Sequence, residues 1–123
     1  MTKPHILCVE DQLVMQRMIK IALASDFDVD TADHGLDGFQ KAVKRKDNYD
    51  LIITDLNMPE MDGITMIKRL RALTRFSGVP ILVVSTESET SKKTSAKEAG
   101  ANGWIVKPIA AEKLLKAAKK LTH

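Results

Sequence analysis

Cysteine, aromatic residues and long apolar runs are scarce in this chain. The single cysteine, Cys8, cannot form an internal disulfide, and its apolar neighbours predict a buried thiol, as in proteins of a reducing cytoplasm. Apolar runs reach only four or five residues, whereas a membrane-spanning helix needs roughly 20. The first residues carry one positive charge and no apolar core of signal-peptide length. Aromatic residues make up 4% of the chain and do not alternate with basic ones, so nothing supports a nucleic-acid surface.

The composition is otherwise that of an ordinary globular protein. The chain has 123 residues, of which 44% are hydrophobic and 28% charged, with a net charge of +3. No low-complexity run or Gly/Ser-rich linker divides it. We therefore expect one domain over residues 1–123, in the cytoplasm, without insertion into a membrane.

Five short apolar runs alternate with five longer segments and predict strands. They cover residues 6–9, 27–32, 51–54, 81–84 and 104–106. The second run places Phe27, Val29 and Thr31 on one face and aspartates on the other, which is typical of an edge strand. The other four runs are continuously apolar, which predicts burial on both faces of a parallel sheet.

The segments between these runs predict helices. Four carry apolar stripes at helical spacing. The predicted stripes are Val14, Met18, Ile21 and Ala22; Leu36, Phe39 and Val43; Ile64, Ile67 and Leu70; and Ala111, Leu114, Leu115, Ala118 and Leu121. Residues 88–99 have almost no apolar face, so we expect a weakly anchored helix there.

This alternation predicts an α/β fold of the doubly wound, flavodoxin-like type. Five βα units form a parallel sheet with helices on both faces, and the common strand order is 2-1-3-4-5. Ligands of such sheets bind at the carboxyl ends of the first and third strands, where the strand order reverses.

Charged and hydroxyl residues follow four of the predicted strands. Glu10 and Asp11 follow the first and Asp55 the third; Ser85 follows the fourth and Lys107 the fifth. Three carboxylates gathered at one sheet edge repel one another unless a cation lies among them. An all-oxygen set with few direct carboxylates suits Mg²⁺, and a lysine could hold an anionic group opposite the metal.

The same residues exclude other users of this fold class. The acidic loop after the first strand would repel the phosphate of a flavin nucleotide, and neither G-x-G-x-x-G nor G-x-x-x-x-G-K-[ST] occurs. A phosphatase of the haloacid dehalogenase type would place Asp-x-Asp after its first strand. Here the nearest pattern is Asp55-Leu56-Asn57, after the third.

Two stretches and one acidic pair resemble the receiver domains of two-component response regulators, in particular the single-domain chemotaxis (CheY) type. The stretches are residues 50–63, DLIITDLNMPEMDG, and residues 99–108, AGANGWIVKP; the pair is Glu10-Asp11. The resemblance covers nearly the whole chain. It implies a receiver domain with no output domain after His123, which catalyses only its own phosphorylation and dephosphorylation.

The resemblance also implies a role for each site residue. Asp55 is the expected phosphoryl acceptor. Asp11, Asp55 and the backbone carbonyl of Asn57 are expected to bind Mg²⁺, and Glu10 is expected to bind it through water. Ser85 and Lys107 are expected to contact the phosphoryl group. The Lys107–Pro108 bond corresponds to one that is cis in the family.

Signalling is expected to pass through Ser85 and Trp104, the aromatic switch. Asn57 and Glu87 are expected to orient the water that ends the phosphorylated state.

Three positions depart from the commonest family pattern. Thr86 stands where a small residue is usual, Trp104 where Tyr or Phe is usual, and Ile109 where Phe is frequent.

The expected partners are a CheA-like sensor histidine kinase and a downstream protein such as a motor component, with the chain itself a monomer. A histidine phosphotransfer protein is the alternative target, which would make the chain a phosphate carrier in a relay. Two other functions are alternatives: a binding module that no longer uses phosphorylation, which the complete residue set argues against, and a magnesium phosphatase acting on small esters.

Overall fold

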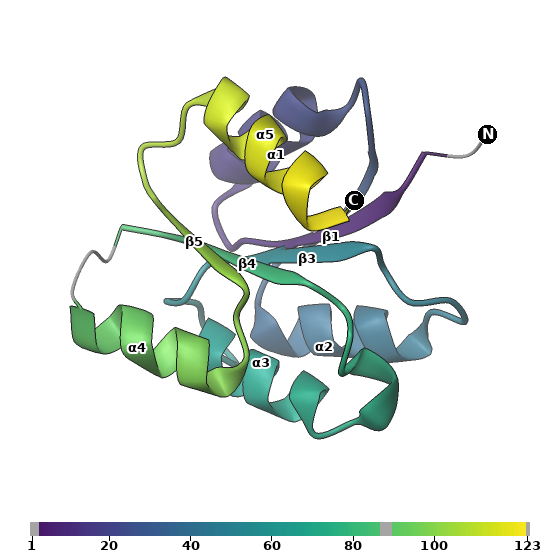
Figure 1. Ribbon diagram of the computed structural model, residues 1–123, viewed down its shortest axis with the longest axis vertical. Helices are drawn as coiled ribbons and strands as arrows, with labels where there is room; N and C mark the ends of the chain where they lie inside the picture. Colours follow the sequence, from purple (N-terminus) through teal and green to yellow (C-terminus); the bar gives the residue numbers. More distant parts are fainter. Residues whose placement is uncertain (1–2, 87–89, 123) are drawn as a thin grey trace.

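The computed structural model describes residues 3–86 and 90–122, and it confirms the predicted architecture. The elements are β1 (His5–Val9), α1 (Leu13–Leu23), β2 (Asp28–Ala32), α2 (Gly35–Lys44), β3 (Leu51–Thr54), α3 (Gly63–Arg71), η1 (Thr74–Phe76), β4 (Ile81–Ser85), α4 (Thr90–Ala99), β5 (Gly103–Val106) and α5 (Ala111–Thr122). The strands form one parallel sheet in the order β2-β1-β3-β4-β5. Figure 1 shows α1 and α5 on one face of the sheet and α2, α3 and α4 on the other.

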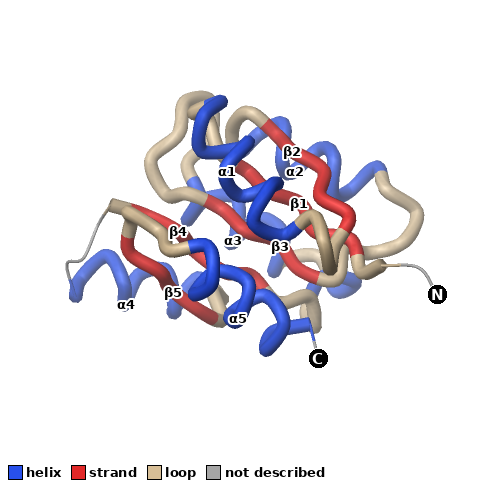
Figure 2. The backbone as a smooth tube through the Cα atoms, turned by 90° about the horizontal axis from the view of Figure 1, so that it is seen from above, coloured by secondary structure: helices blue, strands red, loops and turns tan. Residues whose placement is uncertain are grey.

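Two hydrophobic cores lie on the two faces of the sheet, because successive side chains of a strand point to opposite sides. In β1, Leu7 and Val9 enter the core beneath α2, α3 and α4, while Ile6 and Cys8 enter the core beneath α1 and α5. Figure 2 shows the sheet from above, with α1 and α5 lying across the strands. The thiol of Cys8 is fully buried, as predicted, and burial raises its pKa to about 12.

The two edge strands differ in how well the sequence predicted them. β2 is an edge strand with exposed Asp28 and Asp30 on one side and buried Val29 on the other, which confirms the prediction. The prediction that residues 104–106 are buried on both faces is wrong. β5 is the other edge strand, and while Ile105 is buried, Trp104 is half-buried and Val106 is 40% exposed.

The stripe predicted for α1 is also wrong. Val14, Met18 and Ile21 are 73%, 49% and 78% exposed, and only Ala22 of that stripe packs against the core. The buried residues are Gln16, Ile19 and Leu23, on a neighbouring face of the helix. Both faces have apolar residues at helical spacing. The face that packs includes the polar Gln16, so its apolar pattern was the weaker of the two.

The remaining stripes are largely confirmed. Ile67, Leu70, Leu114 and Ala118 are buried, and Leu36, Phe39, Ile64, Leu115 and Leu121 pack against a core while partly exposed. Val43 and Ala111, by contrast, are exposed. None of the helices within residues 3–86 and 90–122 is long and apolar enough to cross a bilayer.

The helix predicted over residues 88–99 is observed as α4, which begins at Thr90; residues 88 and 89 lie outside the described part. Its only buried residues are Ala96 and Ala99, so its apolar anchoring is slight, as predicted. Arg71 holds the far end of the helix, because Nε and Nη2 donate to the carbonyl oxygen of Gly100 at 3.2 and 2.8 Å.

Candidate functional site

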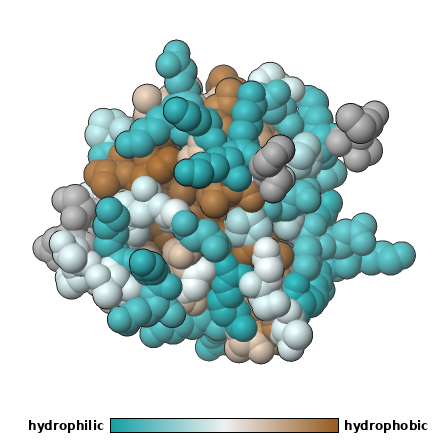
Figure 3. All heavy atoms as spheres, viewed as in Figure 1, coloured by the Kyte–Doolittle hydropathy of each residue, from teal (hydrophilic) through white to brown (hydrophobic). Residues whose placement is uncertain are grey.

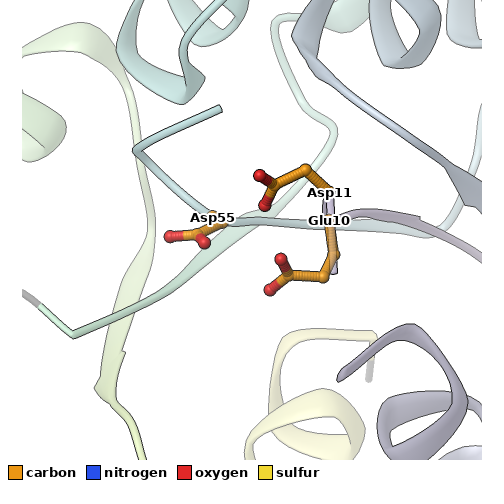
Figure 4. Close-up of side chains that lie close together, drawn as sticks. All are labelled: Glu10, Asp11 and Asp55. Atoms are coloured by element: carbon orange, nitrogen blue, oxygen red, sulfur yellow. The ribbon is translucent and has the colours of Figure 1, made fainter. Parts of the chain in front are cut away.

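Three carboxylates from two adjacent strands meet at the carboxyl edge of the sheet. Glu10 and Asp11 directly follow β1, and Asp55 directly follows β3 (Figure 4). A carboxylate oxygen of each lies within 4.8 Å of one from each of the others. Such a cluster is unfavourable unless a cation compensates it. The arrangement therefore suits a hard divalent cation such as Mg²⁺, which takes oxygen ligands and retains water.

Lys107 crosses to this cluster from the end of β5. Its Nζ donates to Oε1 of Glu10 at 2.7 Å and to Oδ2 of Asp55 at 3.1 Å. The three side chains are only 8%, 2% and 11% exposed. Burial alone would lower the pKa of Lys107, but the hydrogen bonds to Glu10 and Asp55 and the negative charges of these two carboxylates together raise that pKa. The lysine is therefore a fixed cation beside Asp55.

Glu10 is the most deeply buried member of the cluster. Burial raises the pKa of its carboxyl group, and the hydrogen bond from Lys107 opposes that rise. Its second oxygen, Oε2, accepts a hydrogen bond from the backbone N–H of Gln12 at 3.1 Å. Asp11, by contrast, is exposed. The two neighbours thus differ: Asp11 is open to an incoming ligand, whereas both oxygens of Glu10 already have partners.

The chain around Asp55 is held tightly by its own backbone. The N–H of Asp55 donates to the carbonyl of Val9 at 3.1 Å, and the N–H of Leu56 donates to Oδ1 of Asp55 at 2.7 Å. Gly63 closes the loop, because a Cβ there would lie 2.1 Å from the carbonyl oxygen of Asp55. Asp62 caps α3 by accepting from the N–H of Thr65 at 2.7 Å. The dipeptide Asp62-Gly63 before a helix is the sequence signal for this closure.

Ser85 ends β4 with its side chain buried, and the backbone N–H of Lys107 donates to its carbonyl at 2.8 Å. The Lys107–Pro108 bond is cis, as the resemblance implied. Asn57 and Thr86 are exposed beside the site, and Glu87 lies outside the described residues. Ile109 packs with α1 and α5, on the opposite face of the sheet from Trp104.

Trp104 lies beside α4, away from the carboxylates. It is paired in register with Val83, while Ser85 is paired with Val106 one step further along the same face. The ring borders a hollow of about 270 Å³ that Lys93, Ala96 and Lys97 of α4 also line. Within the part of the chain that the structure describes, the indole Nε1 is buried without a hydrogen-bond partner. The ring thus contacts the helix with the weakest apolar anchoring.

Gln16 of α1 is a polar residue at the site that the sequence did not reveal. Its side-chain amide donates to the carbonyl oxygen of Glu10 at 2.6 Å. Its spacing of three and seven residues from Ile19 and Leu23 places it on the buried face of the helix. A polar residue in phase with two buried apolar residues is the signal that could have identified it.

Comparison with known proteins agrees with this fold and site. The response regulator receiver domain family matches residues 6–119. The chain therefore belongs to the response regulator receiver family.

Within that family, the chain is similar to several chemotaxis proteins. It is 39% identical over 106 residues to the chemotaxis protein CheY1 of Helicobacter pylori, covering 85% of each chain. It is 34% identical over 116 residues to CheY of Pseudomonas aeruginosa, covering 94% of each. The structure of CheY4 of Vibrio cholerae matches with a TM-score of 0.90 and 36% identity, covering 98% of this chain and 99% of that one.

One structural neighbour carries the metal that the acidic cluster suggests. The receiver domain of the sensor histidine kinase PA1611 of Pseudomonas aeruginosa matches with a TM-score of 0.89 and 25% identity, covering 98% of both chains. That structure has a magnesium ion coordinated in its active site cleft. Together with the Glu10, Asp11 and Asp55 cluster, it makes Mg²⁺ the cation to test.

Proposed function

We propose that this receiver accepts a phosphoryl group on Asp55 from a sensor histidine kinase, in a magnesium-dependent reaction, and serves as a cytoplasmic switch in chemotaxis or motility. The observation that carries the proposal is the position of Lys107, which holds a buried ammonium 3.1 Å from Oδ2 of Asp55, next to two further carboxylates. The ammonium of Lys107 on one side of Asp55 would bind the negatively charged phosphoryl group. The acidic cluster on the other side would bind the metal cation.

The chemistry proposed for Asp55 is nucleophilic. One carboxylate oxygen attacks phosphorus, the new O–P bond gives an acyl phosphate, and the N–P bond of a phosphohistidine donor breaks with its electron pair remaining on the imidazole. Asp11 and Asp55, with the backbone carbonyl of Asn57, would hold Mg²⁺, and Glu10 would contact it through water. When bound, the metal would neutralise charge on the transferred group.

Lys107 and Ser85 complete the proposed surroundings of the phosphoryl group. The ammonium of Lys107 would leave its hydrogen bond with Asp55 for a phosphoryl oxygen, and the hydroxyl of Ser85 would donate to another. Charge develops on these oxygens during transfer, so donors held in place beforehand lower the barrier. The chain would thus contribute positioning and fixed charge.

The signal would pass from Ser85 to Trp104 and then to the surface of α4, β5 and α5. Ser85 and Trp104 share one face of the sheet, and the hollow beside the ring leaves room for it to move. The proposed partners are a CheA-like kinase and a downstream protein such as a motor component. Transfer onward to a histidine phosphotransfer protein is the competing proposal, and Asn57 and Glu87 are the residues proposed to set the lifetime that distinguishes the two.

Labelling with a small acyl phosphate in the presence of Mg²⁺ tests the acceptor. We expect the parent protein to gain one phosphoryl group by intact mass and the Asp55→Asn variant to gain none. Asp62→Asn is the matched control, because asparagine also caps a helix and Asp62 lies in the same loop. A stable adduct on Asp55→Asn would disprove the assignment. A long-lived adduct that passes to a phosphotransfer protein would favour the relay.

A further inference from the structure

Gln16 is a buried amide in a helix face that is otherwise apolar. It is 6% exposed and lies one and two turns before Ile19 and Leu23, which pack in the core beneath α1 and α5. A buried amide is costly unless its hydrogen bonds are satisfied, and methionine would fill a similar volume without that cost. The presence of a glutamine here therefore needs an explanation.

The hydrogen bonds of Gln16 supply one. Nε2 donates to the carbonyl oxygen of Glu10 at 2.6 Å and to Oδ1 of Asp33 at 3.0 Å, so both amide hydrogens have an acceptor. Asp33 lies just after β2, and its own N–H donates to Oδ2 of Asp37 at 3.0 Å. Gln16 thus joins the ends of two strands, β1 and β2, from a third element.

Glu10 stands where the chain leaves β1 and turns toward α1. Its N–H donates to the carbonyl of Ala32 at 3.0 Å, and its carbonyl oxygen accepts from Gln16. Both backbone groups of Glu10 are therefore fixed. The orientation of this peptide unit determines where the next residue, Asp11, projects its carboxylate.

We propose that Gln16 is a positioning residue for the acidic cluster, holding the peptide between Glu10 and Asp11 so that the Asp11 carboxylate faces Asp55 before a cation arrives. The inference rests on the proposed function only in that the cluster binds Mg²⁺. Residues that orient metal ligands from behind typically change metal affinity by about 10–100-fold when they are replaced.

The test compares Mg²⁺ affinity in three variants by calorimetry, at a temperature at which circular dichroism shows each to be folded. Gln16→Met keeps the volume and removes both donors, so we expect the Kd for Mg²⁺ to rise about 10-fold. Gln16→Arg should recover most of the loss, because its Nε is as many bonds from Cα as Nε2 of glutamine. Ile19→Ala, on the same helix face, should destabilise the protein and leave the Kd within about twofold of the parent.

A second readout needs no metal. In the metal-free Gln16→Met variant, the backbone amide of Gln12, which donates to Oε2 of Glu10, should exchange with solvent faster than in Ile19→Ala. An unchanged Kd in Gln16→Met, an equal loss in Ile19→Ala, or no Mg²⁺ binding by the parent would each overturn the inference. Mg²⁺ binding without labelling of Asp55 would refute the proposed function and leave this one standing.

Discussion

The helices α1 and α4 follow two strands of the same sheet, α1 after β1, which leads to Asp11, and α4 after β4, which ends in Ser85, yet they are anchored in different ways. α1 buries Ile19 and Leu23 and adds the hydrogen bonds of Gln16. α4 buries two alanines. The stabilisation from burial is proportional to the apolar area removed from water, and alanine has little of it. Packing therefore stabilises α4 far less than it stabilises α1.

The fixation of α4 is concentrated at its far end. Arg71 binds the carbonyl of Gly100 and Oδ1 of Asn102, and Oδ1 of Asn102 also accepts from the N–H of Ile81 at 2.8 Å. The site thus lies between a rigid side, which holds ligands in place, and a side that can shift at low cost, as a switch requires.

The largest expected effect comes from removing Lys107, the cation that forms ion pairs with both Glu10 and Asp55. In Lys107→Ala, the buried Glu10 loses its partner and lies beside Asp55, and breaking such a pair costs about 3–5 kcal/mol. Burial raises the pKa of Glu10, and loss of Lys107 raises it further. Urea denaturation at neutral pH should show the loss of unfolding free energy.

The pH dependence identifies the cause. A carboxyl group with a raised folded-state pKa takes up a proton on folding, so its contribution to stability is present at low pH and lost as the pH rises. The deficit of Lys107→Ala should therefore be largest near about pH 8 and shrink toward about pH 5. Lys97→Ala, on the exposed side of α4, is the control. A deficit independent of pH would argue against an unpaired Glu10.

Mg²⁺ should stabilise the protein by a somewhat smaller amount. At 100 times its Kd, a ligand that binds only the folded state adds about 2.7 kcal/mol to the free energy of unfolding. Asp11→Asn should remove most of that gain, because Asp11 is the exposed carboxylate of the cluster. The measurement is Tm with and without Mg²⁺. If Mg²⁺ shifts the Tm of neither the parent nor Asp11→Asn, the metal site is ruled out.

Trp104 reports on the movable side, and its response should be a spectral change rather than a large change in stability. Its emission should change little with Mg²⁺ alone, since the ring lies beside α4 and away from the carboxylates. With a beryllofluoride mimic of the phosphoryl group, we expect intensity and wavelength to change as Ser85 moves and the ring turns inward. In Ser85→Ala the mimic should still bind while the emission change shrinks. Constant emission on binding would make Trp104 a packing residue.

Much of this arrangement follows from local patterns. Continuous apolar runs such as residues 51–54 predicted buried strands, and acidic residues directly after them predicted the site, because parallel strands end at one sheet edge. The side chains that reach across the sheet were harder to predict. Nothing local to Lys107 specifies that it pairs with Glu10 as well as Asp55, since that choice depends on the depth of burial at β1.

The packed face of α1 was predicted wrongly for a different reason. Ile19 and Ile21 are two residues apart on one helix, but Ile19 is 2% exposed and Ile21 is 78% exposed. Apolar surface is visible in the upper half of Figure 3, where Figure 1 places α5 and α1. An apolar residue on the surface satisfies a helical pattern as well as a buried one does, so periodicity alone cannot distinguish them.

Replacing Ile19 and Ile21 with serine, one at a time, distinguishes the buried face of α1 from the exposed face. Ile21→Ser should change the free energy of unfolding by no more than about 0.5 kcal/mol, because an exposed side chain away from caps and networks contributes little to folding. Ile19→Ser should cost at least about 2 kcal/mol, since it leaves a cavity and buries a hydroxyl. Urea denaturation measures both, and equal slopes with denaturant would show that neither variant alters the extent of unfolding. Equal losses at the two positions would mean that α1 packs through both faces, and the rigid side of the site would then owe its anchoring to more than Gln16, Ile19 and Leu23.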